Sequence, residues 1–140
     1  ESAEVLARGH GGGGETWEAD DVERASHAYR DAVSKESVRV DPVIPGIGRG
    51  LQEPMELAGY MLPKGSMLAC SILLAHFNEA IWPNPERFDP ERFLSGGSNG
   101  TATPKPTPYT YFPFGGGIRR CIGEAFALFE MRIVIATVLR

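Results

Sequence analysis

Residues 112–127, which read FPFGGGIRRCIGEAFA, form the most informative segment of the chain. Three consecutive glycines come shortly before Cys121, and an apolar, helix-forming segment follows it. Glycine accepts backbone angles that other residues avoid, and it lets the chain approach a bulky group closely. Backbone N–H groups at the start of the following helix favour the thiolate form of a cysteine. A thiolate presented in this way is either a nucleophile or a metal ligand.

The remaining residues bear on which of these roles Cys121 has. A nucleophile needs a base within hydrogen-bond reach, and none of His10, His27 and His76 is close in sequence, although the fold could bring one near. Zinc and iron–sulfur sites need several soft ligands, whereas the only other cysteine is Cys70, which lies in an apolar run. Haem iron needs a single protein thiolate, because the porphyrin supplies four donors. The glycines and arginines beside Cys121 disfavour the alternative of a buried structural cysteine.

Composition excludes several classes of protein. The 140 residues suffice for one modest domain, and the net charge of −4 gives no basic surface for nucleic acid. No apolar run reaches the length of a membrane span, and the first residues are no signal peptide. Two distant cysteines do not form a disulfide framework, so we expect a reducing compartment and a cytoplasmic location.

Residues 18–41 are predicted to be helical, with a well-defined helix from about His27 to Val40 that stops before Pro42. The three-and-four spacing puts Glu36 on the apolar face of this helix. An ionised carboxylate there is costly unless it is paired, and Arg39 is within reach three residues later. The sequence therefore predicts a structural ion pair rather than an ordinary surface pair.

Residues 42–76 are predicted to form strands. Residues 42–50, which include Arg49, should run extended, and three short strands follow at 55–57, 60–62 and 67–74. Between the last two lies a turn with Pro63 at its second position and Gly65 at its fourth. A small antiparallel sheet is the natural arrangement.

The other segments complete the predicted organisation. Residues 1–17 are a helix tail and a glycine-rich loop, 77–94 a proline-rich meander, and 95–110 a flexible surface loop. Residues 111–140 hold the cysteine loop and a last helix from about Ile122 to Arg140. That helix is apolar nearly all the way round, so we expect it to be buried on several sides. The rest of the chain offers too few partners to cover it, and the chain is expected to be a fragment.

The pattern Phe114-x-x-Gly117-x-Arg119-x-Cys121-x-Gly123 resembles the haem-binding loop of the cytochrome P450 family at every defined position. The resemblance implies that Cys121 is the axial ligand of haem b, iron protoporphyrin IX. It implies that Arg119 pairs with a haem propionate and that Phe114 lies against the proximal side of the haem. Gly117 and Gly123 would allow the tight loop.

Two further motifs resemble the same family, in the family's order. Glu36-x-x-Arg39 is similar to the motif of its K helix, and the segment of residues 90–93 is similar to its meander. The resemblance implies that Glu36, Arg39 and Arg92 form one buried network that fixes the meander and the cysteine loop. Removing one member of such a network costs roughly 3–5 kcal/mol. Arg49 falls where many members place a second propionate-binding arginine.

The implied fold class is mainly α with a small antiparallel β-sheet (α+β), about the C-terminal third of the family's fold. The implied reaction inserts one oxygen atom from O2 into a small organic substrate, with electrons from a ferredoxin or a flavoprotein reductase. The helix that carries the family's oxygen-handling acid–alcohol pair is missing, so no catalytic residue is assigned in this segment. Whether the intact protein carries a membrane anchor depends on its N-terminal part.

Two alternatives stay open at this point. The chain could be an inactive haem-binding remnant of a truncated gene. It could also belong to relatives that act as peroxygenases, isomerases or dehydratases and use no electron donor. The sequence upstream of this segment would separate the three.

Overall fold

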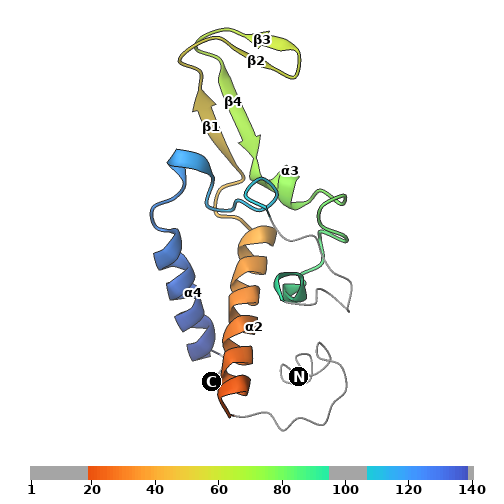
Figure 1. Ribbon diagram of the computed structural model, residues 1–140, viewed down its shortest axis with the longest axis vertical. Coiled ribbons are helices and arrows are strands. Elements are labelled where there is room, and N and C mark those ends of the chain that lie inside the picture. Colours follow the sequence, from red (N-terminus) through yellow and green to blue (C-terminus); the bar gives the residue numbers. More distant parts are fainter. Residues whose placement is uncertain (1–18, 95–106, 139–140) are drawn as a thin grey trace.

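The computed structural model describes residues 19–94 and 107–138, and their side chains from residue 26 onward. Within these ranges, helices α2, α3 and α4 combine with two antiparallel strand pairs, β1 with β4 and β2 with β3 (Figure 1). The predicted α+β class is confirmed. None of the helices in this part of the chain is long and apolar enough to cross a membrane.

Helix α2, Ala19–Val40, is the longest element of the described chain. It ends at the predicted residue, where Asp41 N donates to Ser37 O at 2.9 Å and Pro42 follows. Its start confirms the predicted helical region of residues 18–41, and the single helix begins eight residues before His27, where the better-defined part was predicted to start. The helix presents the buried side chains of Glu36 and Arg39.

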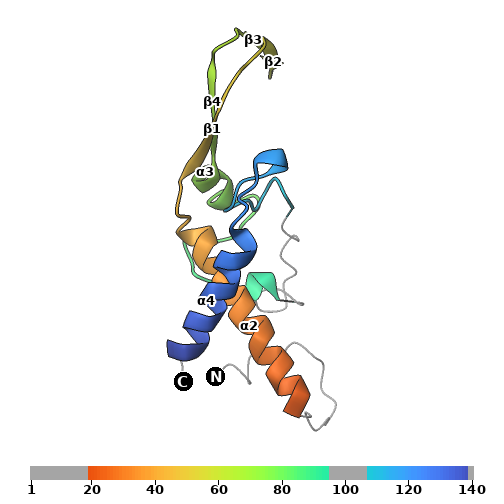
Figure 2. The ribbon, with the colours of Figure 1, turned by 90° about the vertical axis from the view of Figure 1, so that its left-hand side faces the viewer.

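The longer strand pair joins β1, Gly46–Gly50, to β4, Met67–Ser71, with Gly46 opposite Ser71. Beyond it, β2, Met55–Leu57, pairs with β3, Tyr60–Leu62. Figure 2 shows that these strands form a narrow arm that rises away from the helices. The predicted strands at 55–57 and 60–62 are confirmed.

Two details of the predicted strand region are wrong. The strand at 67–74 stops at Ser71, and Ile72–His76 forms helix α3, because the Ser71 side chain caps it by accepting from Leu74 N at 3.2 Å. The predicted turn is shifted by one residue. Ser66 N donates to Pro63 O, so Pro63 is the first position of the turn, and Gly65, with φ of 87°, is the third.

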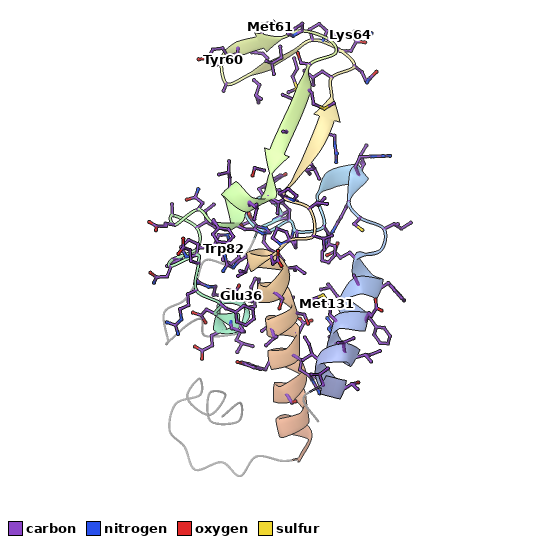
Figure 3. The ribbon with its side chains drawn as sticks, turned by 180° about the vertical axis from the view of Figure 1, so that it is seen from behind. Glu36, Tyr60, Met61, Lys64, Trp82 and Met131 are labelled. Atoms are coloured by element: carbon purple, nitrogen blue, oxygen red, sulfur yellow. The ribbon has the colours of Figure 1, made fainter. Side chains whose placement is uncertain are left out.

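Helix α4, Glu124–Val138, begins two residues after the predicted Ile122 and lies along α2 (Figures 1 and 2). Asp31 of α2 accepts from Arg132 of α4 and pairs with Lys35 at 2.7 Å. Met131 lies on the side of α4 that faces α2 (Figure 3). None of its described residues is buried, because α2 covers one side only. The predicted burial on several sides is therefore not found in the described chain, whereas the expectation that the rest of the chain offers too few partners to cover this helix is confirmed there.

The predicted loop at 1–17 lies outside the described residues, as does most of the loop at 95–110. The described end of that second loop is a turn, in which Thr110 N donates to Thr107 O at 3.1 Å.

Polar and charged side chains make up nearly half of the buried residues of the described chain. Its buried apolar residues are Ala32, Val38, Ile72 and Trp82, together with the prolines Pro42, Pro85 and Pro90. The buried polar and charged residues are Ser34, Glu36, Arg39, His76, Asp89 and Arg92. The ionised side chains predicted from the helix pattern therefore lie at the centre of this part of the molecule.

Candidate functional site

The buried charges form one compact cluster. Arg39 holds Glu36 through two hydrogen bonds, Nε to Oε2 at 2.7 Å and Nη2 to Oε1 at 2.8 Å. Arg92 Nε approaches Glu36 Oε1 at 3.5 Å from η1, Pro90–Phe93. The fork-to-fork contact of guanidinium and carboxylate is the geometry that compensates buried charge best. Figure 3 shows Glu36 on α2, with Trp82 close to it.

The same cluster holds the meander through its backbone. Arg39 Nη2 donates to Pro85 O at 2.7 Å, and Arg92 Nη2 donates to Asn84 O at 2.8 Å. In the opposite direction, Asp89 N donates to Glu36 Oε1 at 2.9 Å. These contacts fix the irregular segment by satisfying its polar groups, as a segment without regular secondary structure requires.

Aromatic rings surround the cluster on the side of the cysteine loop. The guanidinium of Arg39 lies 5.4 Å from the ring centre of Trp82, within cation–π range. Tyr111 packs edge-on against Phe93, with the ring centres 5.1 Å apart, and its hydroxyl donates to Lys35 O at 3.0 Å. Burial raises the pKa of Tyr111, so its hydroxyl stays a donor.

His76 is a residue of this region that the sequence analysis treated only as a possible base. It is the last residue of α3 and is fully buried. Its Nδ1 lies 3.1 Å from Arg39 O, and its Nε2 accepts from Phe112 N at 3.2 Å. Burial, reinforced by the charge of Arg39, lowers the pKa of His76 to about 4, although the hydrogen bond to the Arg39 carbonyl opposes this shift. The only signal in the sequence was a histidine at the end of an apolar run.

The cysteine loop is closed by its own backbone. Gly115 N donates to Phe112 O and Cys121 N donates to Phe114 O, each at 2.9 Å. Gly115 and Gly117 have φ of 77° and 66°, the left-handed region in which a side chain is strained. At these two positions glycine thus provides backbone angles that other residues avoid, as the sequence suggested.

Cys121 is exposed, and so is the surface around it. It follows η2, Gly117–Arg119, and precedes α4 by three residues. Ile118 and Ile122 on either side are fully exposed. The loop therefore presents a thiol at the surface, beside two isoleucines and two arginines, rather than in the core.

The remaining predicted site residues lie around this loop. Phe114 is half-buried, Arg119 is exposed, and Gly123, next to α4, lies close to Cys121: a Cβ there would be 3.8 Å from the thiol sulfur. Arg49 is exposed on β1, where its Nη1 donates to Gly48 O at 2.8 Å. Two residues earlier on β1, the side chain of Ile47 lies beside Gly115.

The structure thus brings Glu36, Arg39 and Arg92 together, and it places the cysteine loop apart from them. His76 is bonded both to the end of α2 and to the start of the loop. No group of three His, Cys, Asp or Glu side chains that could hold a metal ion by itself occurs in residues 19–94 and 107–138.

Known proteins resemble this chain over most of its length. The family model described as Cytochrome P450 matches residues 11–140. The chain is 47% identical over 116 residues to a Mycobacterium tuberculosis protein named "Putative cytochrome P450 135B1", which covers 83% of this chain and 23% of that protein. It is 40% identical over 112 residues to the taurochenodeoxycholic 6 alpha-hydroxylase of Sus scrofa, which covers 79% of this chain and 21% of that protein.

A solved structure described as retinoic acid bound cyanobacterial CYP120A1 matches the fold. The TM-score is 0.71 at 32% identity, and the match covers 96% of this chain and 30% of that one. The chain spans about a quarter of the length of the curated relatives that it matches.

Proposed function

Because this chain belongs to the cytochrome P450 family, we propose that it forms the haem-binding part of a haem-thiolate monooxygenase. In this proposal, the thiolate of Cys121 would hold the iron of haem b. The observation that carries the proposal is the exposed thiol of Cys121 at the end of a glycine loop that matches the family's haem motif. A single thiolate is a sufficient protein donor for haem iron, since the porphyrin supplies four more.

The surroundings of Cys121 fit a large, flat, apolar group that carries carboxylates. Ile118 and Ile122 offer exposed apolar surface beside the thiol, and the guanidinium of Arg119 is a cation that can pair with a propionate. Gly117 and Gly123 let the backbone approach the macrocycle without a side chain in between.

Two further residues complete the proposed haem contacts. Phe114 would pack against the haem, and its carbonyl fixes the backbone of the ligand by accepting from the Cys121 N–H. Arg49 would pair with a second propionate from β1, and the proximity of Ile47 to Gly115 supports this placement.

Glu36, Arg39 and Arg92 have a structural part in the proposal. Their charges are satisfied by one another and by backbone groups of the meander, so they fix the elements around the loop without touching substrate. A buried cluster of this kind stabilises one arrangement, because separating any member leaves a charge without compensation.

When bound, haem supplies the chemistry of oxygen activation, which a thiolate ligand favours by donating electron density toward O–O cleavage. The intact protein would act on a small organic substrate, with electrons from a ferredoxin or a flavoprotein reductase. The hydroxylase activity named for the pig relative and the retinoic acid described in the cyanobacterial structure support an organic substrate. This chain contributes the ligand and its supporting loop.

Paired cysteine variants of the haem-loaded protein that carries this chain test the proposal. Cys121→Ser should abolish the strongly red-shifted Soret band of the ferrous–CO complex, because serine offers no thiolate. Cys70→Ser is the matched control, since Cys70 is also exposed but lies on β4. A red-shifted band that persists in Cys121→Ser, or that is lost only in Cys70→Ser, would overturn the assignment.

A further inference from the structure

We infer that His76 is a positioning residue for the cysteine loop, which it holds to the end of α2 through the backbone of Phe112. The inference rests on the proposed function, since that function gives the position of the loop its chemical consequence. It concerns a buried side chain that lies outside the haem motif and outside the charged cluster of Glu36, Arg39 and Arg92.

The two hydrogen bonds of His76 determine its protonation. Arg39 O can only accept, so the Nδ1 that lies 3.1 Å away carries the proton. Phe112 N–H can only donate, so Nε2, 3.2 Å away, must offer a lone pair. The ring is therefore neutral, with its proton on Nδ1. A second proton, on Nε2, would place an N–H donor opposite the N–H donor of Phe112.

The ring is held firmly enough to act as a spacer. Arg39 Nη1 donates to His76 O at 2.8 Å, so His76 and Arg39 are joined by two bonds in opposite directions. The ring stacks on Tyr111 with the planes 20° apart and meets Phe112 edge-on. A fully buried ring with both nitrogens bonded and three aromatic contacts, the third with Trp82, has little freedom to reorient.

From His76 a short series of hydrogen bonds leads to the cysteine. Its Nε2 fixes Phe112 N, Phe112 O accepts from Gly115 N, and Phe114 O accepts from Cys121 N. The guanidinium of Arg39 bonds to Glu36, His76 and the meander, and so His76 extends this fixed region to the loop. Losing the Phe112 bond would free the start of the loop and loosen the placement of the thiolate.

Two neutral substitutions separate the two bonds of the ring. The amide of His76→Gln can reach the place of Nε2, where its oxygen accepts from Phe112 N. The shorter amide of His76→Asn can reach only the place of Nδ1, where its NH2 group donates to Arg39 O. Both side chains are polar, uncharged and smaller than histidine, so Asn is the matched control for Gln.

The first readout is the ratio of red-shifted to ordinary ferrous–CO bands in the haem-loaded protein that carries this chain. We expect His76→Asn to lower this ratio about tenfold, the scale set by leaving a buried N–H without a partner, and His76→Gln to stay within about twofold of wild type. A purely structural role would lower the amount of haem bound in both variants and leave the ratio unchanged. An unchanged ratio in His76→Asn, or an equal fall in both variants, would overturn the inference.

The second readout needs no haem spectrum. Hydrogen exchange of the Phe112 amide should be protected in wild type and in His76→Gln, and about tenfold faster in His76→Asn. Exchange of this amide at the rate of a free peptide in wild type would overturn the inference even if a variant fails to fold. If wild type shows no red-shifted band, the proposed function fails, whereas the exchange experiment still decides whether His76 positions Phe112.

Discussion

The side chain of Arg39 joins three parts of the described chain. Its guanidinium donates to the carboxylate of Glu36, to the carbonyl of His76 at the end of α3, and to the carbonyl of Pro85 in the meander. A planar fork of five N–H groups can satisfy acceptors in several directions, which the single ammonium of lysine does less well. The charge is tolerated in the core because these oxygens replace water.

The contribution of Arg92 to stability can be compared with that of Arg87, an exposed arginine of the same meander. In the intact protein, Arg92→Ala should lower the free energy of unfolding by roughly 3–5 kcal/mol and reduce haem retention, because Glu36 loses a buried partner. Arg87→Ala, at an exposed position of the same meander, should change stability by less than about 0.5 kcal/mol. Denaturant unfolding and the haem-to-protein ratio measure both effects. Equal losses of stability and of bound haem in the two variants would show that Arg92 has no special part in the cluster.

His76 gives the protein a defined pH dependence. The pKa of His76 is about 4 in the folded state and 6.5 in the unfolded chain. Between these two pH values the unfolded chain therefore binds a proton at His76 that the folded chain does not bind. Stability should therefore fall as the pH drops from 6.5 to about 4, by up to about 3 kcal/mol from this residue.

Denaturant unfolding at several pH values checks this expectation. His76→Gln has no proton to take up, so its stability should fall less than that of wild type over the same pH range. The difference between the two proteins removes the contribution of the carboxylates. Parallel curves for wild type and variant would show that His76 titrates normally in the folded state.

At the scale of elements, the pairing of β1 with β4 depends on a close approach of two backbones. A Cβ at Gly46 would lie 2.8 Å from the carbonyl oxygen of Cys70, and backbone cannot move aside as a flexible side chain can. Gly50 at the other end of β1 has no atom within 4 Å of its would-be Cβ. The two ends of β1 thus differ in whether the space around them can hold an added methyl group.

We therefore expect Gly46→Ala to destabilise the protein by about 1–3 kcal/mol, the usual cost of forcing a methyl group into a filled space. Gly50→Ala should leave stability within about 0.5 kcal/mol of wild type, since its methyl group points into open space. Urea unfolding of the two variants measures the difference. Equal destabilisation would mean that the contact with the Cys70 carbonyl does not decide the outcome.

Elements were predictable from the sequence where local chemistry alone determines them. The spacing of Glu36 and Arg39 on one helix face anticipated their pairing, and the strands at 55–57 and 60–62 lie where their residues indicated. Helix α3 was not predictable in this way, because its apolar residues continue the pattern of β4. One hydroxyl, that of Ser71, accepts from Leu74 N and marks the change from strand to helix.

For the molecule as a whole, the described core is charged and much of the apolar side-chain surface lies outside it. Phe126, Phe129 and Val138 of α4 are exposed, as are Tyr60 and Met61 at the far end of the strand arm (Figure 3). The chain spans about a quarter of the length of its relatives, so most of the residues of such a protein are not in this segment. The apolar residues all round α4 indicated burial, but the described chain covers this helix only on the side that faces α2, as the shortage of partners led us to expect.

The role of His76 could not be predicted, because it depends on contacts between distant residues. Its two partners lie 37 residues before it and 36 residues after it, at the ends of segments whose relative placement no local pattern reveals. The cysteine loop carries its own signal, since its glycines and its thiol are contiguous. The sequence thus indicated the proposed haem ligand more readily than the residue that we infer positions it.

Whether Cys121 provides the thiolate ligand of a haem can be decided by X-ray absorption at the iron edge of the haem-loaded protein that carries this chain. We expect one sulfur atom in the first coordination shell of iron in wild type and in Cys70→Ser, and none in Cys121→Ser. A first shell of nitrogen and oxygen alone in wild type, or a sulfur that survives in Cys121→Ser, would contradict this assignment.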